Sequence, residues 1–303
     1  MRIALITPAG PGTRNGNRHT ALRWAAFLRA AGHRVSVEVE WSGRDADLML
    51  ALHARRSHAS IRAFPRRRVV ALTGTDVYRD IRTSAEAQES LELAERLIVL
   101  QPKAAEELNK VYREKVRVVV QSSSTQLRHA PARRFRLCVL GHLREEKDPM
   151  RILAALRHVD LPLEVIHLGA SLDTRLQQEA RAGMRRDPRY RWLGNVPHAR
   201  ALRWLASSHA MVISSRMEGG ANVVCEALRI GVPILASRIS GNVGLLGASY
   251  PAYFPVEDEK ALARLIHRLS DDTFYRRLKR AIAPLRAKVS PRAEAQALRK
   301  ALA

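Results

Sequence analysis

The chain has 303 residues, which at roughly 150 residues per domain predicts two domains, each with its own core. Lys and Arg number 52 against 29 Asp and Glu, and the resulting net charge of +23 fits a nucleic-acid partner, phosphorylated metabolites or a role in solubility alone. A hydrophobic content of 46% excludes a disordered chain, and no run of about 18 apolar residues is present to cross a bilayer.

Short apolar runs alternate with longer helical patterns, which is typical of parallel sheets with crossover helices. Helical stretches cover His19–Ala31 and Ala85–Ala94 in the first half. The predicted strands there are Arg2–Ile6, Arg34–Val39, Asp47–Leu52, Val69–Leu72, Leu97–Leu100 and Val116–Val120. The alternation stops in the polar, Ser-rich stretch Gln121–Arg134, so we predict an N-terminal domain over residues 1–128 and a C-terminal domain over 129–303.

The second half repeats the alternation. Its predicted strands are Leu137–Leu140, Leu163–Leu168, Tyr190–Leu193, Ala210–Ile213 and Ile234–Ala236, and its helices include Met150–Val159, Thr174–Arg186 and Asn222–Arg229. From Asp258 onward the pattern is helical, broken at Pro284 and again at Ser290-Pro291, and the last helices are expected to pack back on the N-terminal domain. The fold class is therefore α/β, with two doubly wound halves whose ligands should bind at the carboxyl ends of the strands.

The first residues form a predicted strand and lack the cleavage site of a secretory signal. Cys138 and Cys225 lie far apart in apolar segments, which argues against a disulfide scaffold or a zinc cluster and favours a reducing cytoplasm.

A glycine-rich loop follows the first strand and precedes a helix that Asn17 or Thr20 could cap. Backbone N–H groups at such a turn suit a phosphate or a carboxylate, although the spacing is neither that of a dinucleotide-binding loop nor that of a P-loop. A flexible loop accounts for the pattern equally well. The residues that would bind an anion here are Gly10, Gly12, Arg14, Gly16, Asn17 and Arg18.

The segment Thr73-Gly74-Thr75-Asp76 follows the fourth strand. Gly74 allows a ligand to approach the backbone closely. Asp76 could accept a hydrogen bond from a hydroxyl or act as a base, although a structural helix cap is the commoner role for an isolated Asp. Asp45 and Asp47 form an Asp-x-Asp pair of the kind that holds a metal, but they lie where a strand begins. We interpret that pair as fortuitous and expect no metal.

Two further segments follow strands of the second half. After Gly141, Arg144 and Lys147 could clamp a diphosphate, although Glu145 and Glu146 partly cancel their charge and a solvated turn fits as well. The segment Glu218-Gly219-Gly220-Ala221-Asn222-Val223-Val224-Cys225-Glu226 is the most specific feature in the sequence. Its glycines at a helix N-terminus can bind phosphate oxygens, and its two carboxylates can accept bonds from vicinal sugar hydroxyls.

These segments together resemble the retaining-type glycosyltransferases of the GT-B fold, in which a donor domain carries a Glu-x7-Glu motif. Glu218 and Glu226 match that motif, with Gly219, Gly220 and Asn222 in the usual surroundings. The resemblance implies two Rossmann-like domains facing across a cleft, with a UDP-sugar on the C-terminal one. Many members have Arg directly after the glycine, where this chain has His142.

A closer resemblance is to the selenosugar synthases of selenoneine biosynthesis. It covers Asn15–Arg18 with Thr20–Trp24, and also Leu72–Tyr78, Gly141–Pro149 and Gly241–Gly247. It implies transfer of the selenium of selenophosphate to the anomeric carbon of a UDP-sugar such as UDP-N-acetylglucosamine or UDP-glucose. It further implies a functional link to a selenophosphate synthetase and to a downstream selenoneine-forming enzyme. Between Arg62 and Val69 the chain is shorter than is usual in that family.

We therefore expect a cytoplasmic, metal-independent enzyme that needs no cofactor besides its donor substrate. The catalytic residues implied are Glu218, Lys147 and Arg144. The donor site would comprise Gly141, Arg144, Lys147, Glu218, Gly219, Gly220, Asn222, Val223 and Glu226. The acceptor site would comprise Gly10, Arg14, Gly16, Asn17, Arg18, Thr73, Gly74, Thr75 and Asp76. His19, His53 and His142 are candidates to assist the loss of the phosphoryl group, although a structural role suits each of them better.

Two other functions fit parts of the sequence. An ordinary GT-B glycosyltransferase with a hydroxyl acceptor would need the same donor motif. A nucleic-acid-binding protein would account for the charge, but only 5% of the residues are aromatic, and no zinc finger or basic extended helix is present. We expect neither a nucleic acid nor a membrane as the partner.

Overall fold

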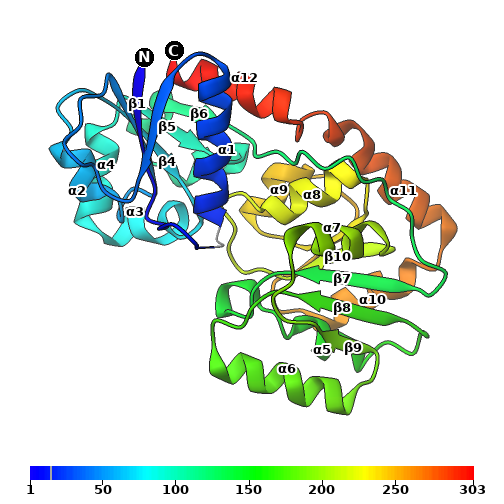
Figure 1. Ribbon diagram of the computed structural model, residues 1–303. Helices are drawn as coiled ribbons and strands as arrows, with labels where there is room; N and C mark the ends of the chain where they lie inside the picture. Colours follow the sequence, from blue (N-terminus) through cyan, green and yellow to red (C-terminus); the bar gives the residue numbers. More distant parts are fainter. Residues whose placement is uncertain (14–15) are drawn as a thin grey trace. The chain divides into compact units, whose positions relative to one another are not determined.

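The computed structural model describes residues 1–13 and 16–303. The chain forms two α/β units, one of Met1–Gln121 with Pro291–Ala303 and the other of Ser122–Ser290 (Figure 1). The first unit thus ends earlier than the predicted residue 128, and it also includes the last helix. One reason lies in the stretch after Gln121, where the backbone N–H of Ser123 donates to the carbonyl of Val289 in the second unit at 3.2 Å.

The first unit contains a six-stranded parallel sheet in the order β2-β1-β3-β4-β5-β6. The strands are β1 (Arg2–Ile6), β2 (Arg34–Glu38), β3 (Leu48–Leu52), β4 (Arg67–Leu72), β5 (Arg96–Val99) and β6 (Val116–Val118). All six were predicted, with ends shifted by two residues at most. Every residue of β3 is buried, as expected for a central strand covered on both faces.

Helices cover both faces of this sheet (Figure 1). On one face pack α1 (Gly16–Ala30) and α12 (Pro291–Leu302), which bury Trp24, Leu28 and Leu298 against β1 and β3. On the other lie α2 (His58–Ala63), α3 (Ile81–Thr83) and α4 (Ala85–Leu93). Because α1 begins at Gly16, Asn17 and Thr20 lie inside the helix and do not cap it. Thr20 Oγ1 instead donates to the carbonyl of Gly16 at 2.8 Å.

The second unit contains another six-stranded parallel sheet, in the order β12-β11-β10-β7-β8-β9. Its strands are β7 (Arg136–Leu140), β8 (Glu164–Leu168), β9 (Tyr190–Trp192), β10 (Ala210–Ile213), β11 (Ile234–Ser237) and β12 (Tyr253–Phe254). The first five were predicted. The last has two residues, too few to show any periodicity, and the sequence did not reveal it.

The helices of this unit are α5 (Arg151–Leu156), α6 (Thr174–Arg186), α7 (His198–Ala206), α8 (Asn222–Ile230), α9 (Ser240–Leu246), α10 (Glu259–Arg268) and α11 (Asp272–Ile282). The break predicted at Pro284 is confirmed, because α11 ends at Ile282 and a 3₁₀ turn, Ala283–Arg286, follows. Within residues 1–13 and 16–303, no helix combines the length and the apolar character needed to cross a bilayer. Cys138 and Cys225 are buried free thiols.

Each sheet has one point where the strand order reverses. In the first unit the chain runs outward from β1 to β2 and returns on the other side of β1 to form β3. In the second unit the reversal lies between β7 and β10. Loops that leave neighbouring strands at such a point diverge and open a crevice at the carboxyl ends, where ligands of open α/β sheets bind.

Candidate active site

The reversal point of the second unit brings two of the predicted site residues into contact. Lys147 is the last residue of the 3₁₀ turn Glu145–Lys147 in the loop after β7, and Glu218 lies in the loop after β10. Lys147 Nζ donates a hydrogen bond to Glu218 Oε1, and Ser215 Oγ donates to the same oxygen at 2.6 Å. Glu218 is only 7% exposed, so its carboxylate is held inside the loop rather than at its tip.

The glycines after Glu218 lead into α8. Gly219 is buried, Gly220 is partly exposed and the helix begins at Asn222, as predicted. The first backbone N–H groups of α8 have no carbonyl of their own helix to bind, which is the property that makes a helix N-terminus suit a phosphate. Asn222 and Val223 occupy its first turn and are partly exposed.

Glu226 lies one turn further along α8. Its carboxylate is paired with His198, the first residue of α7, with 2.7 Å between Glu226 Oε1 and His198 Nε2. This hydrogen bond raises the pKa of His198, although burial opposes the shift. The sequence did not single out His198, because it follows Pro197 at the start of a helix and nothing local connects it with Glu226.

Three serines and a glycine support the loop that holds Glu218. Ser214 Oγ donates to the carbonyl of Asp148 at 2.8 Å, and Ser237 Oγ donates to the carbonyl of Ser215 at 2.6 Å. Gly241, in the first turn of α9, lies so close to Glu218 that a Cβ added to it would stand 2.0 Å from the Glu218 carbonyl oxygen. Sequence reasoning assigned none of the four to the donor site, although Gly241 lies in a segment that carries the resemblance. Ser214 and Ser215 follow β10 and Ser237 ends β11, and these positions were the signal for the serines.

The remaining donor-site predictions lie in the loop after β7. Gly141 packs against Gly169, and Ala170 N donates to His142 Nδ1 at 3.0 Å, which gives His142 a structural contact. Arg144 is half exposed, and its Nε lies 4.0 Å from Glu146 Oε2. Lys147 is therefore held beside Glu218, whereas Arg144 lies near the carboxylate of Glu146 in its own turn.

In the first unit, Asp76 ties two loops together. Its Oδ1 accepts from the backbone N–H of Thr73 at 2.6 Å, and its Oδ2 accepts from that of Ala54 at 3.0 Å. Burial raises the pKa of Asp76 to about 7, and these amides hold it below what burial alone would produce. Because the residue is fully buried, it does not face a ligand as an exposed base, and its role is structural. Thr73 is also buried, whereas Gly74 and Thr75 are partly exposed.

The glycine loop after β1 is described in part. Thr13 N and Thr13 Oγ1 both bond to the carbonyl of Gly10, at 3.3 and 2.7 Å, and Gly12 has a positive φ of 82° that favours glycine. Gly16, Asn17 and Arg18 form the first turn of α1, and His19 beside them is exposed. Arg14 lies outside the described residues.

The acidic pair Asp45 and Asp47 has cationic partners. Arg2 bonds to both carboxylates, at 2.6 and 3.1 Å, and Arg66 lies 2.7 Å from Asp45. Among the described residues, no group of three or more His, Cys, Asp or Glu side chains is placed to hold a metal ion.

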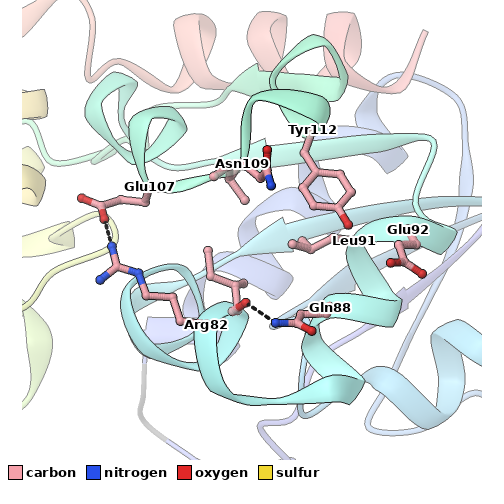
Figure 2. A pocket seen from close by; sticks show the side chains of 9 residues that line it. Arg82, Gln88, Leu91, Glu92, Glu107, Asn109 and Tyr112 are labelled. Carbon is pink, nitrogen blue, oxygen red and sulfur yellow. Dashed lines mark hydrogen bonds and ion pairs between the residues drawn. The ribbon is translucent and has the colours of Figure 1, made fainter.

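A cavity of about 310 Å³ opens in the first unit between α3, α4 and the 3₁₀ turns Pro102–Glu107 and Lys110–Lys115 (Figure 2). Arg82 and Glu107 form an ion pair at its edge, and Gln88 Nε2 donates to the carbonyl of Ile81 at 3.3 Å. Tyr112 and Glu92 lie on the opposite side. None of the described residues predicted for the donor or acceptor site lines this cavity.

Residues 134–272 match the model of the family "Glycosyl transferases group 1". The second unit is therefore similar to group 1 glycosyltransferases over most of its length. Its matched part contains Lys147, Glu218 and Glu226 and the strands that position them.

Solved glycosyltransferases share the fold of the whole chain. Sucrose-phosphate synthase from Thermosynechococcus elongatus is 16% identical with a TM-score of 0.79, covering 99% of this chain and 97% of its own. Alr3699/HepE from Anabaena, solved with UDP and glucose, is 15% identical with a TM-score of 0.78, covering 100% and 99%. The catalytic domain of starch synthase IV from Arabidopsis thaliana, bound to ADP and acarbose, is 11% identical with a TM-score of 0.73, covering 99% and 98%. The predicted GT-B fold is confirmed.

Proposed function

We propose that the protein is a UDP-sugar-dependent glycosyltransferase that joins the selenium of selenophosphate to the anomeric carbon of the sugar. The UDP-sugar part of this proposal rests on the contact between Lys147 and Glu218 at the strand reversal, beside the glycines that precede α8. In the proposed donor site, this fixed cation and helix N-terminus would stabilise the negative charge that a leaving diphosphate gains. Alr3699/HepE, which has the same fold, was solved with UDP and with UDP-glucose, which supports a UDP-sugar donor.

In the proposed reaction the selenium lone pair forms a C–Se bond at the anomeric carbon. The bond between that carbon and the diphosphate oxygen breaks, and its electron pair leaves with UDP. Lys147 and the amides at the start of α8 stabilise the departing charge, while Glu218 and Glu226 accept hydrogen bonds from hydroxyls of the hexose and the ribose. Water then attacks phosphorus, the P–Se bond breaks, and inorganic phosphate and a 1-selenosugar result.

The choice of selenophosphate as acceptor rests on the sequence resemblance and on the chemistry of selenium. An oxygen nucleophile needs a general base. The selenium of selenophosphate is already anionic near neutral pH, so no base is required. That suits a first unit in which Asp76, the carboxylate of the predicted acceptor segment, is buried and engaged by two backbone amides.

The test is to incubate the purified protein with selenophosphate and UDP-N-acetylglucosamine or UDP-glucose under reducing conditions. We expect UDP, inorganic phosphate and a selenium-containing sugar by mass spectrometry, with one donor preferred. If no selenium-containing sugar forms with either donor, the proposal is wrong. UDP release that depends on a sugar or lipid hydroxyl, and not on selenophosphate, would identify an ordinary glycosyltransferase instead.

A further inference from the structure

His53 has an unusual backbone conformation at the reversal point of the first sheet. It follows β3 directly, where β3 lies between β1 and β4, and its φ is +76° although it is not a glycine. Residues with side chains rarely adopt this conformation unless their surroundings enforce it, and such positions cluster at functional sites. The side chain is 2% exposed, so His53 does not itself meet a ligand.

The hydrogen bonds of His53 determine which ring nitrogen carries the proton. Burial and the nearby charges of Arg56 and Arg55 lower the pKa of His53 to about 4, so the ring is neutral at physiological pH. The backbone N–H of Arg56 points to Nδ1 at 3.4 Å, which makes Nδ1 the acceptor. The proton therefore resides on Nε2, which faces Thr75 Oγ1 at 3.3 Å.

This assignment also determines what Thr75 can do. Its hydroxyl oxygen accepts a hydrogen bond from the N–H of His53 Nε2, so the hydroxyl hydrogen remains available to donate. Thr75 is partly exposed, at the carboxyl end of β4, and the π-helical turn Asp76–Asp80 begins directly after it. Single turns of π-helix are rare in proteins overall, and those that do occur often lie at functional sites.

Two carboxylates lie near the ring of His53, and each also has hydrogen-bond or ion-pair partners elsewhere. Asp76 Oδ2 and Asp80 Oδ2 each stand 3.8 Å from a ring nitrogen of His53. Asp76 accepts from two backbone amides, and Asp80 is paired with Arg55 and with Arg79, each at 3.1 Å. Arg56, which follows Arg55 in the segment after β3, is a third cation near His53. The surroundings of Thr75 are therefore compatible with an anion.

We infer that His53 is a positioning residue that holds the Thr75 hydroxyl as a hydrogen-bond donor to an anionic acceptor of the phosphate class. The identity of that acceptor as selenophosphate rests on the proposed function. The existence of an oxyanion-binding subsite at Thr75 does not depend on it. It assigns His53 a role through Thr75, without contact to substrate and without proton transfer.

The experiment compares the binding of inorganic thiophosphate, measured by calorimetry, with the KM for selenophosphate. Thr75→Val removes the hydroxyl and keeps the shape, and we expect thiophosphate to bind about tenfold more weakly. His53→Leu removes the N–H donor and should weaken binding by about threefold to tenfold. His53→Gln retains an N–H donor at the same backbone strain and should restore binding to within about twofold of wild type.

The double variant His53→Leu/Thr75→Val separates positioning from a structural role. If His53 acts through Thr75, the His53 change has no further effect once the hydroxyl is absent. The KM for the UDP-sugar should stay constant in all variants. Thr83→Val, an exposed threonine of α3 in the same segment, is the matched control and should bind thiophosphate like wild type.

The outcomes distinguish this inference from the proposed function. Turnover of selenophosphate with a normal KM in Thr75→Val and His53→Leu would overturn the inference and leave the function intact. Thiophosphate binding that depends on both residues, in a protein that makes no selenosugar, would support the subsite and contradict the function. A wild-type protein that binds no thiophosphate, or variants with additive losses, would overturn the inference.

Discussion

Lys147 donates its hydrogen bond to the same oxygen of Glu218 that accepts from Ser215, so the cation expected to hold a diphosphate is paired with a carboxylate of its own chain. The two groups come from the loops after β7 and β10, which are neighbouring strands of the sheet although far apart in sequence. A diphosphate that binds Lys147 must compete with this carboxylate, while a sugar hydroxyl can offer Glu218 a replacement donor.

The first prediction concerns this competition. Glu218→Gln keeps the volume of the side chain and removes the charge that opposes the diphosphate. We expect UDP, which has no hexose, to bind at least as tightly as in wild type, measured by calorimetry. Turnover of the UDP-sugar should fall by about 100-fold, because the contact to the transferred sugar is weakened.

Lys147→Ala is the counterpart and should act in the opposite direction on binding. It removes the cation, so UDP should bind about tenfold or more weakly. It also leaves the buried carboxylate of Glu218 with Ser215 as its partner, at a cost of about 1–3 kcal/mol in the free energy of unfolding. Weaker UDP binding by Glu218→Gln, of the same size as in Lys147→Ala, would contradict the competition.

The second prediction concerns Gly241. A Cβ there would stand 2.0 Å from the carbonyl oxygen of Glu218, and no side-chain rotation relieves a clash with backbone. Gly241→Ala should push the start of α9 away from the Glu218 loop. We expect a loss of about 1–3 kcal/mol in unfolding free energy together with at least a roughly tenfold fall in kcat/KM for the donor.

Gly183→Ala provides the matched control for that loss of stability. Its Cβ would meet the flexible end of Leu153 at 2.3 Å, in the contact of α6 with α5, away from Glu218. It should therefore leave the donor kinetics like those of wild type, and its effect on stability should be smaller than that of Gly241→Ala, because Leu153 can move and Ala favours a helix interior. Equal kinetic losses in the two variants would mean that Gly241 has no specific part in the donor site.

The strands could be predicted because each is a short apolar run between helical patterns, as Ala210–Ile213 is. Lys147 and Glu218 could be predicted for the same reason, since each follows such a run and parallel strands end at one edge. The contacts that complete the site come from packing between distant segments. His198 and Glu226 are 28 positions apart in the sequence, and no local pattern connects Gly241 with the backbone of Glu218 that it contacts.

Asp76 illustrates the same limit in the first unit. The sequence left open whether this residue was structural or faced a ligand, and the answer depended on the amide of Ala54, which lies 22 positions away in the loop after another strand. Local patterns place a residue at a strand end. Burial and hydrogen-bond partners then decide its chemistry, and both depend on the assembled sheet.

A third prediction concerns the last helix, α12, and the buried carboxylate of Glu294. Arg23 donates to both of its oxygens, at 2.8 and 3.1 Å, and Trp24 Nε1 donates to one of them at 2.7 Å. Glu294 is 1% exposed. Glu294→Ala leaves a guanidinium and a buried indole N–H without this acceptor, so we expect a loss of about 3 kcal/mol or more in the free energy of unfolding.

Urea unfolding followed by circular dichroism measures that loss. The control is Glu179→Ala, which removes the exposed i,i+4 pair with Arg175 on α6 and should change the free energy of unfolding by about 0.5 kcal/mol at most. A Glu294→Ala protein as stable as the Glu179→Ala protein would show that α12 is not held by this carboxylate.

The fourth prediction is a pH dependence set by His198 and Glu226. Because the pKa of His198 is raised in the folded protein, the ion pair stabilises the fold fully below the ordinary imidazole pKa of about 6.5. That contribution disappears as the pH rises through the folded pKa. Since His198 is 64% exposed, the pair contributes about 0.5 kcal/mol. The difference in unfolding free energy between wild type and His198→Ala should therefore be largest near about pH 5.5 and vanish by about pH 8.

Donor binding should respond in the opposite sense. Charged His198 engages the carboxylate that we expect to accept ribose hydroxyls, so raising the pH releases Glu226 for the donor. The dissociation constant for UDP-N-acetylglucosamine, whose diphosphate does not titrate in this range, should fall as the pH rises from about 5.5 to 8 in wild type and stay level in His198→Ala. Tighter binding at low pH in wild type would mean that charged His198 orients Glu226 for the ribose rather than competing for it.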